Sequence, residues 1–207
     1  MRIVAGFFAA LTLCLGSVSA HAGAAPRQIA GIVMGAQIDQ YRDMLRTETA
    51  LPVRRVESLT EVELKPMEGY QSGSVTYGNC ENPGRIVKVK LRYDRDDKDF
   101  FEELFKRFKE RFGETSEYKG DPFRMFLAWK WSFTDGKGNR VSLILQHNSM
   151  DDDDFPSGNV VKISHTTEIE KERRCLERTQ AAGKDPGRAA PPRKGKGQED
   201  FSRFIPE

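Results

Sequence analysis

The sequence has no large excess of either charge and no long apolar run beyond its first residues. Its 207 residues carry 33 basic and 31 acidic side chains, a formal charge of +2. Nucleic-acid-binding proteins usually have a clustered basic surplus, so this balance predicts no nucleic-acid partner. A hydrophobic fraction of 38% and a charged fraction of 31% also exclude a polytopic membrane protein and a wholly disordered chain.

Motifs that carry chemistry are also missing. The chain has no Gly-x-Ser-x-Gly, no phosphate loop, no dinucleotide fingerprint and no zinc-ligand spacing. We therefore assign no catalytic residue and expect no cofactor, although the absence of motifs does not exclude an enzyme.

Histidine is scarce, with three residues in the whole chain. His147 precedes the acidic run Asp151 to Asp154, whose carboxylates are suitable ligands for a hard cation. That run lacks the spaced ligands and the glycine of a calcium loop. We expect a solvated loop here and no metal site.

The one long apolar run has the form of a secretory signal. A basic Arg2 is followed by apolar residues 3–15 and by small residues that end at Ala20-His21-Ala22. Thirteen residues of helix would cover about 20 Å of a hydrocarbon layer of about 30 Å. We expect residues 1–22 to be removed, the mature chain to have no transmembrane span, and export to the periplasm of a Gram-negative bacterium or otherwise to the extracellular space.

Cysteine is equally scarce, and the expected removal of the signal peptide changes the number of cysteines from odd to even. Cys14 leaves with the signal, so the mature chain keeps Cys80 and Cys175. Two cysteines in an oxidising compartment predict one disulfide bond. They lack the Cys-x-x-Cys spacing of redox catalysts, so a catalytic thiol is not expected.

The clearest structural element lies at residues 98–112, where six apolar side chains recur at helical spacing. Five of them are phenylalanines. This pattern predicts an amphipathic helix that packs on the core. Asp96, Asp97 or Asp99 can cap its start, Glu102 stands three residues after Asp99 as in a capping box, and Gly113 can end it.

The other segments predict an α+β fold, an antiparallel sheet with helices packed on one face in the order α-βββ-α-βββ-α. The expected outer helices are 37–46 and 168–178, and the expected strands are 61–65, 73–77, 85–93, 124–133, 139–147 and 159–166. We place one domain at residues 27–180. The stretches 84–89 and 158–163 share the pattern Gly-x-(Ile/Val)-Val-Lys-(Val/Ile), which is compatible with a duplicated α-βββ unit.

Alternation along the strands predicts which side chains share a face. Met125, Leu127, Trp129, Trp131 and Phe133 share one face, which we assign to the core. The opposite face of the sheet would be basic. Its cationic residues are Lys88, Lys90, Arg92, Lys130 and Lys162. This face is either a solvated surface that discourages edge association or a platform for an anionic partner, unless acids such as Glu61 and Glu63 compensate its charge.

Residues 181–207 change in composition to Ala, Gly, Pro, Lys and Arg, which predicts a disordered basic tail. The tail ends in an apolar group at Phe201, Phe204 and Ile205.

Taken together, these features favour an exported, soluble binding or protein-interaction module of the cell envelope. One alternative is a carrier of a small apolar ligand, in which the Phe-rich helix stands away from the sheet around a cavity. The second alternative is an enzyme without a recognisable motif.

Overall fold

The structure, a computed structural model, describes residues 24–54, 56–150 and 157–182. The expected signal peptide, the acidic run 151–154 and nearly all of the expected tail lie outside these ranges.

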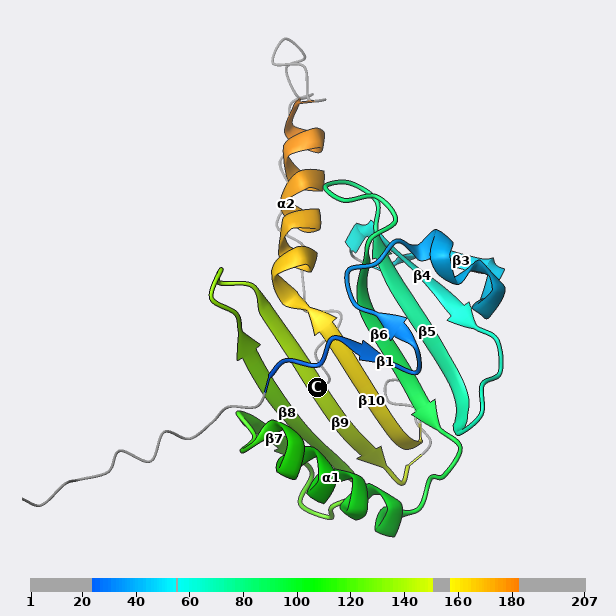
Figure 1. Cartoon of the computed structure of the whole chain (residues 1–207), viewed down its shortest axis with the longest axis vertical. Helices are drawn as coiled ribbons and strands as arrows, with labels where there is room; N and C mark the ends of the chain where they lie inside the picture. Colours follow the sequence, from blue (N-terminus) through cyan, green and yellow to red (C-terminus); the bar gives the residue numbers. More distant parts are fainter. Residues whose placement is uncertain (1–23, 55, 151–156, 183–207) are drawn as a thin grey trace, which may run out of the picture.

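The described chain is a mixed α+β fold built on one large antiparallel sheet (Figure 1). The sheet has eight strands in the order β3-β4-β5-β6-β10-β9-β8-β7. The strands are β3 Leu45–Val53, β4 Val56–Leu64, β5 Tyr70–Gly78, β6 Ile86–Tyr93, β7 Glu117–Gly120, β8 Phe126–Thr134, β9 Arg140–Asn148 and β10 Gly158–His165. A separate hairpin, β1 Gln28–Ile29 and β2 Ile32–Val33, precedes them.

Three helices accompany the sheet: the 3-10 helix η1 Ile38–Met44 and the α-helices α1 Lys98–Phe112 and α2 Thr166–Ala182. The predicted class is therefore confirmed, but the predicted element order is not, because each half of the sheet contains a fourth strand. The duplication of an α-βββ unit stays a prediction.

The two unpredicted strands of the main sheet, β3 and β7, are its edges. All four residues of β7 are exposed, and β3 buries only Leu45 fully among its nine residues. Edge strands of this kind have no alternation of apolar and polar side chains. The expected helix 37–46 is too long at its C-terminal end, because β3 begins at Leu45.

The Phe-rich helix α1 packs on the core as predicted. Phe105 stacks on Trp129 with ring centroids 4.8 Å apart, and Phe108 contacts Trp131 edge to face at 5.8 Å. The N-cap is Asp97, whose carboxylate accepts a hydrogen bond from the Phe100 backbone N–H at 2.8 Å. Because Asp97 is the cap, the predicted capping-box role of Glu102 is wrong.

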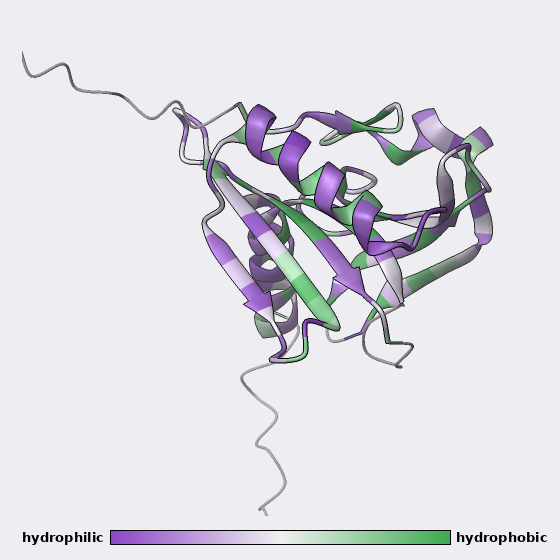
Figure 2. Ribbon diagram, turned by 90° about the horizontal axis from the view of Figure 1, so that it is seen from below, coloured by the Kyte–Doolittle hydropathy of each residue, from purple (hydrophilic) through white to green (hydrophobic). Residues whose placement is uncertain are grey.

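The predicted core face of β8 is largely confirmed, since Leu127, Trp131 and Phe133 are buried. Met125 is 38% exposed, because it precedes the first residue of β8 and is not paired within the sheet. The β1–β2 hairpin and η1 lie on the same side of the sheet as α1 (Figures 1 and 2). Ile32, Met34 and Ile38 join the core there.

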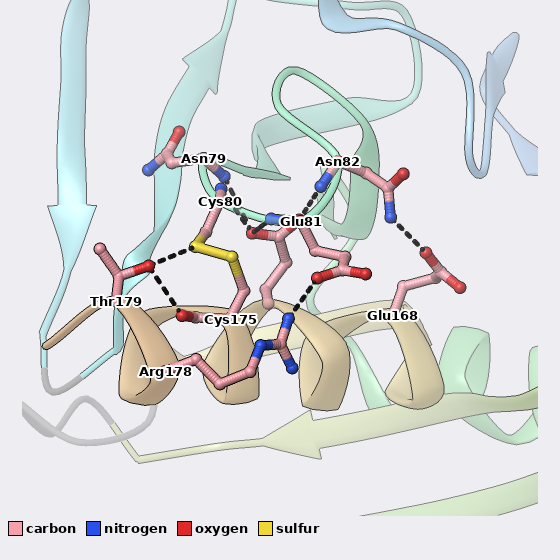
Figure 3. Close-up of polar contacts among 9 residues, drawn as sticks. Asn79, Cys80, Glu81, Asn82, Glu168, Cys175, Arg178 and Thr179 are labelled. Atoms are coloured by element: carbon pink, nitrogen blue, oxygen red, sulfur yellow. Dashed lines mark hydrogen bonds and ion pairs between the residues drawn. A yellow bond between two sulfur atoms is a disulfide. The ribbon is translucent and has the colours of Figure 1, made fainter. Parts of the chain in front are cut away.

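Helix α2 is fastened to the loop that connects β5 and β6 (Figure 3). The predicted disulfide is present, with the Cα atoms of Cys80 and Cys175 5.8 Å apart. Beside it, the buried carboxylate of Glu172 accepts hydrogen bonds from the backbone N–H groups of residues 79–82, at distances of 2.7 to 3.2 Å. One acidic side chain thus satisfies four consecutive backbone donors.

We expect Glu172→Gln to lower the free energy of unfolding by about 2–3 kcal/mol. The amide has one acceptor oxygen instead of two and places its own N–H groups against backbone donors. Urea unfolding with the disulfide intact measures this loss. Glu177→Gln is the control, because Glu177 is exposed on the same helix and lies 4.0 Å from Arg173. Equal unfolding midpoints for wild type and Glu172→Gln would contradict the prediction.

Candidate functional site

The strand register places the five predicted cationic residues on one face of the sheet, opposite α1. Lys90 of β6 lies directly opposite Lys162 of β10, and Lys162 lies opposite Ile144 of β9, which in turn lies opposite Lys130 of β8. Directly paired residues share a face, and so do residues two apart on a strand. Lys88 and Arg92 flank Lys90 at this spacing.

Four of these residues form a group that we name the cationic cluster: Lys88, Lys90, Arg92 and Lys162. Among the described residues, none of the four makes an ion pair. Lys130 differs, because its ammonium lies 3.0 Å from the carboxylate of Glu117 on β7. Lys130 therefore shares the face but is compensated at the edge of the sheet.

The two acids that could compensate the cluster differ in how they are paired. Glu63 pairs with Arg46 of β3 at 2.7 Å, so its charge is matched by a cation outside the cluster. Glu61 raises the pKa of Lys90 by its charge, but it makes no ion pair with any described residue. The cluster retains a net positive charge.

Burial and mutual repulsion both act on the lysine pair. Burial lowers the pKa of Lys162 to about 8, and the charges of Lys90 and Lys88 lower it in the same direction. The pKa of Lys90 is also lowered, chiefly by burial; the charge of Glu61 opposes this shift, and the charges of Lys88 and Arg92 add to it. Like charges directly opposite each other destabilise a sheet, so this pair weakens the folded state.

A buried amide beside the pair has a free donor. Gln146 of β9 is 2% exposed, and its Oε1 accepts a hydrogen bond from Lys162 Nζ at 2.9 Å. Among the described residues, its Nε2 has no hydrogen-bond partner, and neither does the buried Nε of Arg92. A search for charged residues alone misses Gln146, although the alternation of side chains along β9 places it on the polar face.

A recess of about 320 Å³ adjoins the cluster on the β3–β6 side. Its lining includes Arg46, Ser72, Ser74, Lys90 and Arg92, together with Glu61 and Glu63. Hydroxyl and cationic donors therefore continue from the cluster into a hollow of the surface.

His147 and His165, the two histidines in the described ranges, do not share a site. His147 is buried, its Nδ1 lies 2.8 Å from Asn159 Oδ1, and its ring packs near Phe101. The Asn159 amide donates to the backbone oxygens of Arg95 and Asp97, so this contact holds the start of α1. His165 lies six positions along β10 from Asn159, the residue paired with His147. In the described ranges, no three His, Cys, Asp or Glu side chains are grouped to hold a metal ion.

Aromatic contacts fill the space between α1 and the two tryptophans of β8. The alternative of an apolar-ligand carrier stays a prediction, because a groove lies elsewhere along α1, beside Phe108 and Phe112. No protein-family model matches the sequence, and comparisons with curated proteins and with solved structures give no significant match.

None of the described helices is long and apolar enough to cross a membrane.

The lowered pKa of Lys162 predicts a pH-dependent stability. Between pH 8 and 10.5 the folded protein has released this proton while the unfolded chain still binds it, so stability rises with pH in this window. We expect wild type to gain stability relative to Lys162→Met between pH 7 and 10. Urea unfolding at both pH values measures the difference.

Lys130→Met serves as the control, because Lys130 is paired with Glu117 at the sheet edge. Its stability difference from wild type should stay constant over this pH range. A Lys162→Met difference that is equally constant would contradict the assigned pKa.

Proposed function

We propose that this protein is an exported binding module that receives an acidic segment of a protein partner on the cationic cluster. The observation that carries the proposal is the Lys90–Lys162 pair, which lies on the two central strands without an ion pair to any described residue. A solvated sheet face needs no such arrangement, since exposed lysines can be spaced apart or paired, as Lys130 is. An anionic partner would turn a repulsive pair into a favourable one.

The free donors support the same function. Carboxylate oxygens accept hydrogen bonds from ammonium, guanidinium and amide groups alike. The unpaired Nε2 of Gln146 and Nε of Arg92 are buried beside the lysines, where an unmet donor costs about 1–3 kcal/mol. The hydroxyls of Ser72 and Ser74 line the adjoining recess as further donors, together with the carboxylates of Glu61 and Glu63.

Export remains part of the proposal. A disulfide that joins Cys80 to Cys175 is typical of oxidising compartments, and it supports the expected signal peptide at residues 1–22. The envelope of the cell is therefore where we would look for the partner.

We expect the double substitution Lys90→Gln with Lys162→Gln to weaken binding of a fluorescently labelled Glu-rich peptide by about tenfold or more. Fluorescence anisotropy at low ionic strength measures the affinity. The affinity of wild type should fall as salt is added, because exposed charge interactions are screened.

The matched control is Lys119→Gln with Lys130→Gln, which removes the same charge from residues that both contact Glu117. Its peptide affinity should stay within about twofold of wild type if the cluster itself is the site. Equal losses in the two double variants would show that net charge, rather than the cluster, attracts the peptide. No loss in either variant would overturn the proposal.

A further inference from the structure

A second candidate site lies on the opposite face of the sheet from the cationic cluster. A groove of about 660 Å³ runs between the segment 24–29 and the C-terminal half of α1. Figure 1 shows β1 and α1 on this face, with β9 and β10 behind them. The volume lies within the range of about 300–1,000 Å³ that is typical of small-molecule sites.

The lining of the groove is mostly apolar. Leu143, Val161 and Ile163 of the central strands form its floor. Aromatic side chains form the walls: Tyr70 and Tyr93, stacked with centroids 5.2 Å apart, and Phe108 and Phe112, edge to face at 5.7 Å. An extended hydrocarbon chain would find contacts along the whole groove.

Two arginines give the groove a charge preference. Arg27 lines it from the N-terminal segment and Arg111 from α1. Neither takes part in an ion pair within the part of the chain that the structure describes. The Arg111 guanidinium lies 5.5 Å from the centroid of the Phe112 ring, which holds the cation against the apolar wall.

We propose that this groove binds a single-chain amphipath with an anionic head group, such as a long-chain carboxylate or a lysophospholipid phosphate. The acyl chain lies on the floor between the aromatic walls, and the head group is bound by Arg27 and Arg111. Guanidinium groups match both head groups, because their paired N–H donors fit carboxylate and phosphate oxygens. The site is independent of the cationic cluster, since the two lie on opposite faces of the sheet.

The test uses the protein isolated from cells that express the full chain. The probe is 11-(dansylamino)undecanoic acid, and its methyl ester serves as the neutral counterpart. We expect wild type to bind the acid with enhanced dansyl fluorescence, and Arg27→Gln with Arg111→Gln to weaken that binding about tenfold or more. Ester binding should not change, which separates head-group recognition from a loss of folding.

Two further variants fix the position of the ligand. Ala25→Trp should weaken binding of both acid and ester, because Ala25 lines the groove and the indole would fill it. Arg107→Gln, one turn before Arg111 on α1, should have no effect, since Arg107 pairs with Glu103 and lies outside the groove.

Competition with lauric acid and with lauroyl lysophosphatidic acid then distinguishes the two head groups by which one displaces the probe at lower concentration. The proposal is overturned if wild type does not bind the acid, if acid and ester bind equally well, or if Ala25→Trp binds both as wild type does.

Discussion

The antiparallel pairing of β6 with β10 is the contact on which the rest of the structure depends. It joins two four-stranded meanders, β3–β6 and β7–β10, into one sheet through their last strands. Val89 pairs with Ile163 and Leu91 with Val161 on the core face, where all four side chains are buried. Because parity is fixed along each strand, the same register places Lys90 against Lys162 on the other face. The hydrophobic core and the cationic cluster are thus two results of one pairing.

The two faces of this sheet have different chemistry for the same reason. The α1 face is covered by α1, η1 and the β1–β2 hairpin, which meet over the core and leave an apolar groove between the N-terminal segment and α1. On the opposite face the lysines of the cluster share a partly buried environment, and burial lowers the pKa of Lys162 to about 8. Both proposed sites contain cationic side chains, but the cluster surrounds them with polar groups and the groove surrounds them with apolar side chains.

Helix α2 follows β10 directly and is held in place by contacts with a loop that is distant in the sequence. The carboxylate of Glu172 accepts hydrogen bonds from the backbone N–H groups of residues 79–82, and the disulfide next to it joins two cysteines that are 95 residues apart. This attachment links the end of β10 to the β5–β6 loop. It therefore reinforces the β6–β10 pairing from outside the sheet.

The sequence by itself determined the α+β class, the helix α1 with its buried phenylalanines, the disulfide, and the parity that groups Lys88, Lys90 and Arg92. These follow from local periodicity and from counting cysteines. Only the tertiary structure decided that β6 and β10 are neighbours, that Glu63 pairs with Arg46, and that Gln146 accepts a hydrogen bond from Lys162 while its own amide donor has no partner among the described residues. It also revealed the edge strands β3 and β7, which bury too few side chains to leave a pattern. Such features depend on which distant strands meet, and periodicity along one strand carries no information about its neighbour.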